Sequence, residues 1–391
     1  MLTTTKKTLG AAAFALSCSA IGVNAEDATI SDRVKALEEK VDAIGVDFGG
    51  MIYGSYQYNF NDPEDDHNTL RSLDPEANSF TFDLFQLQIN KEGPAGVAFG
   101  SKLDFGKTAS RIASDWNGDG ALDSSEETND FEVEEAYLTW APTWAGGGSV
   151  KAGKFVTLLG SEVIEAPLNP NFTRSFLFGF AIPFTHTGLL FTAPITDQVT
   201  VNAGVVNGWD NVVDNNDGKT FLGNIAFLPT STMSFYANGV FGPEKTDDDG
   251  GPRGVLDLVS SLTFDPVTLS MNFDYGSEGD AAPDGGSAKW TGFSGIAGLA
   301  LADLTGLPAG VYVRGEVFDD SDGARTGTKQ TLTEFTFTGK YFVNDHLTLW
   351  GEFRHDDSDE DSFVDEGPVV DDTPQFTGSQ DTALAAISFV F

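Results

Sequence analysis

The chain contains little cysteine and few basic residues, and each shortage excludes a class of protein. Its 391 residues include one cysteine, Cys18, and 22 Lys and Arg against 59 Asp and Glu, for a formal net charge of −37 at pH 7. So negative a chain repels nucleic acid, which excludes a nucleic-acid role. Its 32 Phe, 6 Trp and 8 Tyr are too many aromatics for a chain kept disordered by its charge.

The first 25 residues have the pattern of a secretory signal peptide. Lys6-Lys7 forms a positive n-region, Leu9–Val23 is apolar, and Val23-Asn24-Ala25 is a small-residue cleavage site. The apolar stretch is too short for a membrane helix, which needs about 20 residues. We therefore predict a signal peptide over residues 1–25. Because Cys18 lies in the removed segment, the mature chain relies on neither a disulfide nor a thiol nucleophile.

Residues 26–45 contain the one clear helical pattern, which we place in the periplasm. Its apolar residues follow alternating spacings of four and three over two heptads, the seam of a coiled coil, at Ile30, Val34, Leu37, Val41 and Ile44. Two heptads are too few to hold a coiled coil alone. The segment is therefore either a short amphipathic helix at the mouth of the following domain or a coiled coil that joins protomers.

From residue 46 to the end, the pattern is one of alternating strands. The last nine residues place Ala383, Ala385, Ile387, Phe389 and Phe391 on one face. A terminal strand with an apolar face suits a transmembrane barrel, whose last strand must pair with its first because an open edge in lipid leaves backbone groups unsatisfied. We predict sixteen strands near 46–60, 79–91, 95–106, 131–141, 148–156, 183–194, 197–209, 219–229, 231–242, 253–264, 266–276, 288–302, 309–319, 329–343, 345–356 and 380–391.

The strands and their connections together predict the fold class. On each strand apolar residues alternate with polar ones such as Thr268, Ser270 and Asn272, as lipid outside and water inside demand. Short turns alternate with long acidic connections, which is the asymmetry of periplasmic turns and outer loops. The chain is therefore predicted to be all-β, a transmembrane antiparallel β-barrel of about 16 strands over 46–391, enclosing an aqueous channel in the outer membrane of a Gram-negative cell.

Residues of about 150–220 resemble the OmpL-like family of β-barrel porins. The motifs that carry this are Gly153-Lys154-Phe155 with Gly160-Ser161-Glu162, Asn169 to Ser175, Pro183 to Gly188, and Gly208 to Asn211 with Asp214 to Gly218. The similarity extends through the barrel, but these motifs are its specific part. The resemblance implies an outer-membrane pore and brings no catalytic residues. The N-terminal heptads resemble, more weakly, those of porins that carry a periplasmic coiled coil.

Segment 115–126 has the spacing of an EF-hand calcium loop. Carboxylate and amide oxygens occupy positions 1, 3, 5, 9 and 12, a carbonyl position 7 and a glycine position 6, which is the ligand pattern of that loop; the residues are Asp115, Asn117, Asp119, Gly120, Ala121, Asp123 and Glu126. Against this, no amphipathic helices flank the segment, so a merely solvated acidic loop is the alternative. Asp214 to Asp217 is a looser candidate for a second ion site.

Segment 157–182 differs from the other long connections because it is apolar. It holds Phe172, Phe176 and Phe180, which would leave a large apolar patch in water unless the segment folded inward. The connection after the fifth strand bends into the lumen in sixteen-stranded porins, and this segment looks similar. The alternative is that it packs against a neighbouring protomer at a trimer interface.

Charged residues on the inner face complete the candidate site. We expect a pore constriction formed by Glu162, Glu165 and Arg174 of segment 157–182 with Lys102, Arg314, Lys340 and Arg354 of the wall. An acidic segment facing a cationic wall would create a transverse field. Alternatively, each Arg and a Glu two residues away, such as Glu316, Glu334 or Glu352, neutralise each other.

Passive diffusion of small hydrophilic solutes through a mildly cation-selective porin is the leading functional interpretation. The alternatives are a surface or envelope-tethering barrel that acts through its calcium-binding loops or coiled coil, and a transporter of hydrophobic compounds, which the polar inner face argues against. The four His residues show no triad spacing and no cofactor motif appears, so we expect no enzyme. Expected partners are outer-membrane lipids, lipopolysaccharide bridged by divalent cations, and two further copies in a homotrimer.

Overall fold

A computed structural model of the chain describes residues 33, 35, 45–113, 130–370 and 373–391. The expected signal peptide, the calcium loop 115–126 and all of helix 30–44 except Arg33 and Lys35, which are both helical, lie outside the described residues. By its internal contacts the chain divides into two units, Met1–Asp47 and Phe48–Phe391. The second unit carries the fold.

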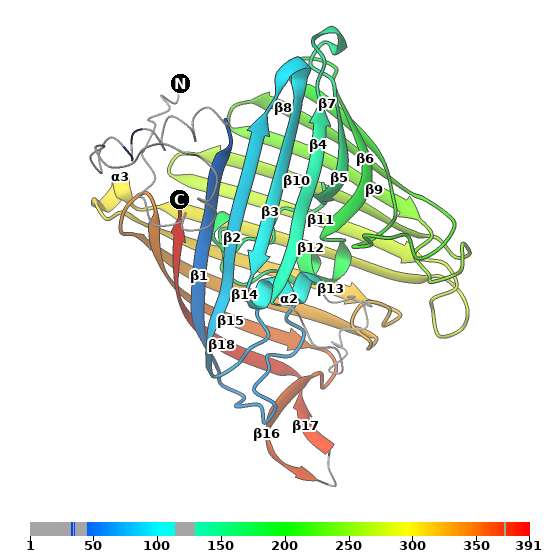
Figure 1. Cartoon of the computed structure of the whole chain (residues 1–391). Coiled ribbons are helices and arrows are strands. Elements are labelled where there is room, and N and C mark those ends of the chain that lie inside the picture. The colour runs from blue at the N-terminus through cyan, green and yellow to red at the C-terminus, as the bar shows by residue number, and fades with distance from the viewer. Residues whose placement is uncertain (1–32, 34, 36–44, 114–129, 371–372) are drawn as a thin grey trace. The chain divides into compact units, whose positions relative to one another are not determined.

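That unit is a closed antiparallel barrel of sixteen strands, as the sequence predicts (Figure 1). Each barrel strand lies beside its neighbour in the chain, and the first strand closes against the last. The barrel strands are β1 (Asp47–Asn59), β2 (Ser79–Glu92), β3 (Val97–Phe105), β4 (Phe131–Trp140), β5 (Ser149–Val156), β6 (Thr185–Pro194), β7 (Val199–Val206), β8 (Thr220–Thr230), β9 (Met233–Gly242), β10 (Arg253–Phe264), β11 (Val267–Glu278), β12 (Ala288–Ala300), β13 (Ala309–Asp320), β14 (Gln330–Phe342), β15 (Leu347–Ser358) and β18 (Ser379–Val390).

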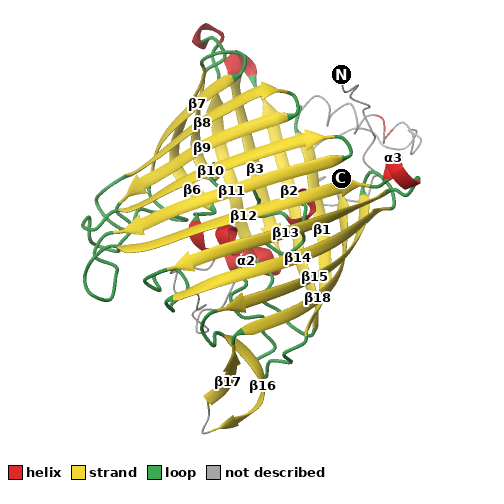
Figure 2. Ribbon diagram, turned by 180° about the vertical axis from the view of Figure 1, so that it is seen from behind, coloured by secondary structure: helices red, strands yellow, loops and turns green. Residues whose placement is uncertain are grey.

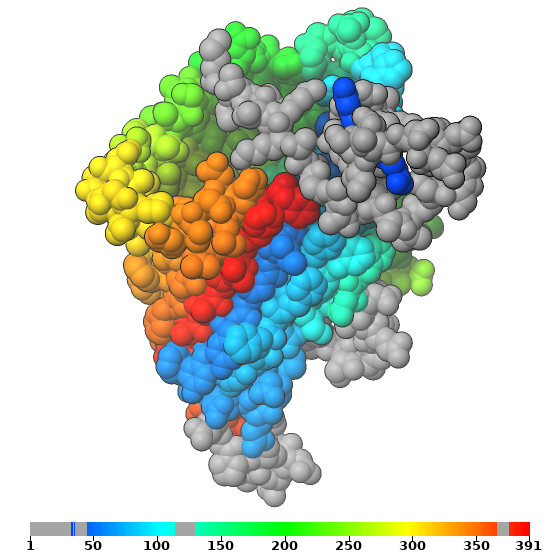
Figure 3. Space-filling view, turned by 60° about the vertical axis from the view of Figure 1, so that its left-hand side comes forward, coloured from blue at the N-terminus to red at the C-terminus, as the bar shows by residue number. Residues whose placement is uncertain are grey.

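The seam between β1 and β18 closes the barrel. The pairing runs from Met51 opposite Val390 to Asn59 opposite Thr382. Beyond the strand end, Phe391 exchanges two backbone hydrogen bonds of 3.0 and 3.1 Å with Gly50. In Figure 3 the red C-terminal strand lies directly against the blue first strand. The terminal aromatic residue is therefore part of the closed hydrogen-bonded ring, which leaves no open edge for lipid to meet.

The two faces of the wall have opposite polarity. On β11, Met271, Phe273 and Tyr275 are 41%, 37% and 44% exposed, whereas the alternating residues Asn272 and Asp274 are 3% and 0% exposed. Because successive side chains point to opposite faces of a strand, the apolar set faces outward and the polar set inward. This arrangement is the one that a barrel in lipid requires.

Three features of the outer loops were not predicted. Strands β16 (Phe363–Val370) and β17 (Thr373–Thr377) form a separate hairpin between β15 and β18. Helix α2 (Lys107–Ala113) follows β3, and short turns η3 (Ala166–Leu168) and η4 (Leu177–Ala181) lie between β5 and β6. The remaining short elements, η1 (Pro94–Gly96), η2 (Thr143–Ala145) and α3 (Ala302–Thr305), lie in the connections on the side of the short turns. Among the described residues, no helix combines the length and apolarity needed to cross a membrane.

Candidate functional site

The connection between β5 and β6, residues 157–182, folds into the barrel, and we call it the inward loop. Most of its side chains are buried, and η4 lies against β11 and β12 (Figure 2). Its apolar residues meet inward-facing side chains of the wall: Phe176, Leu177, Phe178 and Phe180 belong to one buried cluster with Val240, Val255, Trp290, Phe318 and Leu332. The apolar composition of the loop is thus explained by burial inside the barrel.

Two glutamates of the wall hold the backbone of the inward loop. Glu352 on β15 accepts hydrogen bonds from the backbone N–H groups of Phe172 and Thr173, at 2.7 and 3.0 Å. Glu316 on β13 accepts from Phe176 and Leu177 in the same way, at 2.8 and 2.5 Å. Hydrogen bonds to a charged acceptor are stronger than neutral ones. These carboxylates therefore anchor the loop at two points four residues apart.

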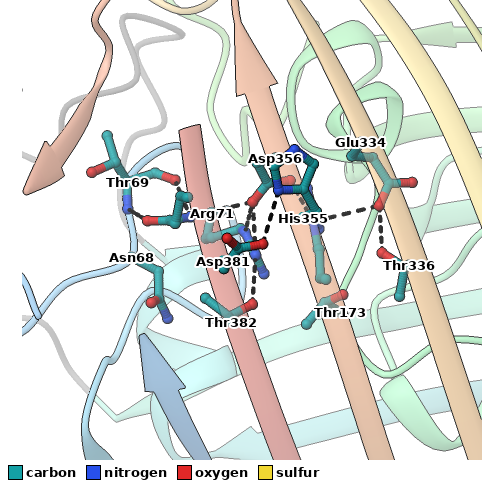
Figure 4. Close-up of polar contacts among 12 residues, drawn as sticks. Asn68, Thr69, Arg71, Thr173, Glu334, Thr336, His355, Asp356, Asp381 and Thr382 are labelled. Carbon is teal, nitrogen blue, oxygen red and sulfur yellow. Dashed lines mark hydrogen bonds and ion pairs between the residues drawn. The ribbon is translucent and has the colours of Figure 1, made fainter. Parts of the chain in front are cut away.

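Arg314 on β13, Arg354 on β15 and Arg71 in the loop after β1 lie in one continuous chain of buried ion pairs. Arg314 on β13 contacts Glu162 of the inward loop and Glu334 on β14, each at 2.7 Å. Acids and arginines then alternate in the order Glu162, Arg314, Glu334, Arg354, Asp356, Arg71 and Asp74. Figure 4 shows part of this chain, with Arg71, Asp356 and Glu334 labelled. The arginines are thus neutralised by carboxylates, mostly from other strands and from the loops.

The two remaining cations expected on this side, Lys340 of the wall and Arg174 of the inward loop, form no ion pairs with the described residues. Lys340 donates to the carbonyl of Asn169 at 2.5 Å and lies 4.0 Å from the centre of the Trp350 ring. Arg174 donates to the carbonyl of Phe172 at 2.5 Å and to that of Ile164, so it joins two parts of the inward loop rather than reaching the wall. Neither residue takes part in an ion pair within the described residues.

Across the lumen, Lys102 and Glu165 do come together. The Lys102 ammonium lies 2.6 Å from Glu165 of the inward loop, 2.9 Å from Glu134 and 3.2 Å from Glu135, both on β4. Of the seven residues expected at a constriction, the structure thus joins Glu162 to Arg314 and Glu165 to Lys102, on opposite walls. One of the two alternatives was a cationic wall that faces an acidic loop. The structure does not contain a cationic wall, because carboxylates surround both Arg314 and Arg354.

A row of hydrogen-bonded polar side chains, four of them amides, runs along the inner wall and was not predicted as a row. Successive side chains hydrogen bond to one another from β6 to β11, and Asn272 then accepts from the backbone N–H of Ser161 in the inward loop at 2.8 Å. The row consists of Thr192, Asn202, Asn224, Asn238, Asp257 and Asn272. The alternation along each strand identifies these residues as inward-facing. Whether they lie beside one another depends on how neighbouring strands are aligned, and this register does not follow from the sequence of a single strand.

Two carboxylates tie the outer loops to the barrel rim. Asp210, in the loop after β7, accepts from the backbone N–H groups of Phe184 and Thr185 at 2.9 and 2.7 Å. Glu244, in the loop after β9, accepts from the N–H of Trp209 at 2.8 Å. Burial raises the pKa of both carboxyl groups, although the hydrogen bonds that they accept oppose the shift.

The barrel fold agrees with a comparison of the chain with models of protein families. A family model described as "Putative beta-barrel porin-2, OmpL-like" matches residues 45–391. The chain belongs to this family. Membership confirms the resemblance found in the sequence and makes the chain a porin-type barrel of the outer membrane. No curated protein matches the chain.

Solved porins share the fold of the chain at low sequence identity. OprB of Pseudomonas putida is 10% identical with a TM-score of 0.60, over 92% of this chain and 97% of that one. The anion-selective porin of Comamonas acidovorans is 12% identical with a TM-score of 0.56, over 88% and 99%. The trimer form of OmpT of Vibrio cholerae is 11% identical, also with a TM-score of 0.56 and the same coverage. At these identities the likeness shows the fold alone.

Proposed function

We propose that the protein is a porin whose water-filled channel lets small hydrophilic solutes diffuse passively across the outer membrane. The observation that carries this is the inward loop, held inside a closed barrel by the wall carboxylates Glu316 and Glu352. A fixed loop narrows the lumen without an energy source or a moving part. The inner wall presents amide, hydroxyl and charged groups, which replace part of a polar solute's hydration as it passes.

We further propose that the channel is mildly cation-selective. The arginines of β13 and β15 are balanced by carboxylates, whereas β3 and β4 carry Asp104, Glu134 and Glu135 for one cation, Lys102. The acidic outer loops add to this negative field within a Debye length, about 10 Å at 0.1 M salt. The anion-selective relative from Comamonas acidovorans indicates that this fold does not by itself set the sign of selectivity.

Planar-bilayer recording tests both statements. The full-length protein should give stable ohmic conductance steps, and its reversal potential under a salt gradient should favour cations, less so as salt rises. Replacing both loop acids, Glu162→Gln with Glu165→Gln, should reduce the cation preference, because these carboxylates lie in the lumen. An absence of steps would contradict the channel; an anion-selective parent or an unchanged double variant would contradict the electrostatic account.

Two partners follow from the same proposal. The trimer form of OmpT supports a homotrimer for this chain, since the two share a fold. The carboxylates of the outer loops suit divalent cations that also bind the phosphates of lipopolysaccharide. Crosslinking of the purified protein in detergent should give a trimer band; a monomer at all protein concentrations would contradict the assembly.

Calcium binding by segment 115–126 stays a prediction, because this segment lies outside the described residues. Its ligand pattern places a bidentate carboxylate at Glu126. In isothermal calorimetry of the whole protein, Ca²⁺ binding should be present in the parent and lost in Glu126→Ala, while Asp130→Ala, just beyond the loop, should bind as the parent does. Equal binding by parent and Glu126→Ala would rule the site out.

A further inference from the structure

A β-bulge on the inner wall presents two consecutive glutamates to the lumen. Between β3 and β4 the register shifts: Lys102 pairs with Glu135 but Leu103 pairs with Val133, so that Glu134 is the additional residue. Both glutamate side chains consequently reach the inward-facing Lys102. In a regular strand they would point to opposite faces. Bulges commonly redirect a side chain in this way at functional positions.

The carboxylates gathered there all converge on one ammonium group. Lys102 contacts Glu134, Glu135 and, from the inward loop, Glu165, at 2.6 to 3.2 Å. The amide of Gln86 on β2 adds bonds of 3.2 Å to Glu134 and to Glu165. Three carboxyl groups therefore surround one ammonium group, even before the neighbouring residues are considered.

Asp104 adds a fourth carboxylate, which has no salt bridge to a cation among the described residues. It lies on β3 beside Gln86, two residues from Lys102 on the same face, and it interacts electrostatically with Lys102 and Glu165. The side chain is 0% exposed, and its polar neighbours are the Glu134 carboxyl and the Gln86 amide, neither of which brings a positive charge. Lys151 on β5 lies 4.0 Å from the centre of the Tyr137 ring and makes no salt bridge among the described residues. A buried carboxylate without a cation of its own is costly, which favours a further cation at this position.

The geometry of the cluster favours an ammonium ion over a metal ion. Among the described residues, no group of three or more Asp, Glu, His or Cys side chains has the arrangement of a metal site. What the cluster already holds is a primary ammonium that donates to several carboxylates at once. Access lies beside Lys102, whose side chain is 21% exposed, against 8% or less for Glu134, Glu135 and Glu165.

We propose that Asp104, Glu134, Glu135 and Glu165 form a binding subsite for protonated amines within the channel. The Lys102 ammonium is its tethered competitor: an incoming amine takes over part of the hydrogen bonds that Lys102 makes, and Lys102 returns when the amine leaves. The subsite would thereby favour solutes that carry a primary amine over other cations of equal charge. This inference rests on the proposed channel function and gives it a substrate class.

Two isomeric cations distinguish the contribution of hydrogen bonding to permeability from that of charge. n-Butylammonium and tetramethylammonium have the same composition and charge, but only the first has N–H donors. With the full-length protein in a planar bilayer and one chloride salt on each side, the reversal potential gives their permeability ratio. We expect a several-fold preference for n-butylammonium, which falls close to unity in Asp104→Asn and rises in Lys102→Met. The same exchange at an exposed position of an outer loop, Asp247→Asn, should leave the ratio unchanged.

The controls keep the inference distinct from the channel function. Each variant is first checked for folding by its heat-modifiable mobility in gels, and Glu135→Gln, which should also lower the ratio, replaces any variant that fails. A parent that conducts but has equal permeability to both isomers, or an Asp104→Asn variant with the ratio of the parent, would overturn the subsite alone. A parent without conductance would overturn the proposed function and the subsite with it.

Discussion

Individual buried charges in this barrel are stabilised by their neighbours on other strands. Arg314 is fully buried and contacts Glu162 from the inward loop and Glu334 from β14. It also donates to the backbone carbonyl of Thr173 at 2.6 Å. Since two of these partners belong to the inward loop and the third to β14, the side chain joins the loop to the wall. Its loss would leave Glu162 buried without a counter-ion and Glu334 with Arg354 alone, at 3.5 Å.

We therefore expect Arg314→Met to destabilise the protein by about 3–5 kcal/mol, the usual cost of removing one partner from a buried pair. Urea unfolding in detergent micelles, followed by tryptophan fluorescence, measures the change. Lys219→Met is the matched control, because its pair with Asp214 is exposed and such pairs contribute about 1 kcal/mol or less. Equal effects of the two substitutions would contradict the structural role of Arg314.

At the scale of the elements, the strands were predictable and some details of their pairing were not. Alternation located all sixteen barrel strands, because lipid and water impose opposite polarity on the two faces. The bulge at Glu134 could not be predicted, since two adjacent glutamates in one strand are also compatible with one facing each way. Helix α2 and the β16–β17 hairpin lie in polar connections, whose sequences show neither the 3.6-residue period of an amphipathic helix nor the two-residue period of a strand.

The contacts of β18, the strand that closes the barrel, lead to a prediction for the C-terminal residue. Deletion of Phe391 removes the two backbone hydrogen bonds to Gly50 and the last aromatic side chain of the seam. We expect the variant to assemble poorly into the outer membrane and to lose the heat-modifiable gel mobility of a folded barrel. Phe376→Ala, in the separate hairpin, removes an exposed aromatic ring and should assemble normally. A folded yield of the deletion equal to that of Phe376→Ala would contradict the role of the seam.

At the scale of the whole molecule, the lumen combines residues that sequence could place with contacts that it could not. The inward loop and Arg314 were expected to face each other, because the loop follows the fifth strand and Arg314 lies about half a turn away. The anchoring of the loop through backbone N–H groups to Glu316 and Glu352 was not predictable, since it depends on the folded path of the loop. The charge balance of the lumen follows from these contacts.

The most direct test of the account is whether the inward loop lies in the conduction path. Leu168 in this loop is 58% exposed, and the only native cysteine, Cys18, lies in the predicted signal peptide, so a cysteine at 168 is a clean target for a thiol reagent. Modification of Leu168→Cys by a bulky water-soluble methanethiosulfonate should lower the single-channel conductance in discrete steps. Val213→Cys, in an outer loop and 81% exposed, should react with little change. An unchanged conductance of modified Leu168→Cys would contradict a channel narrowed by this loop.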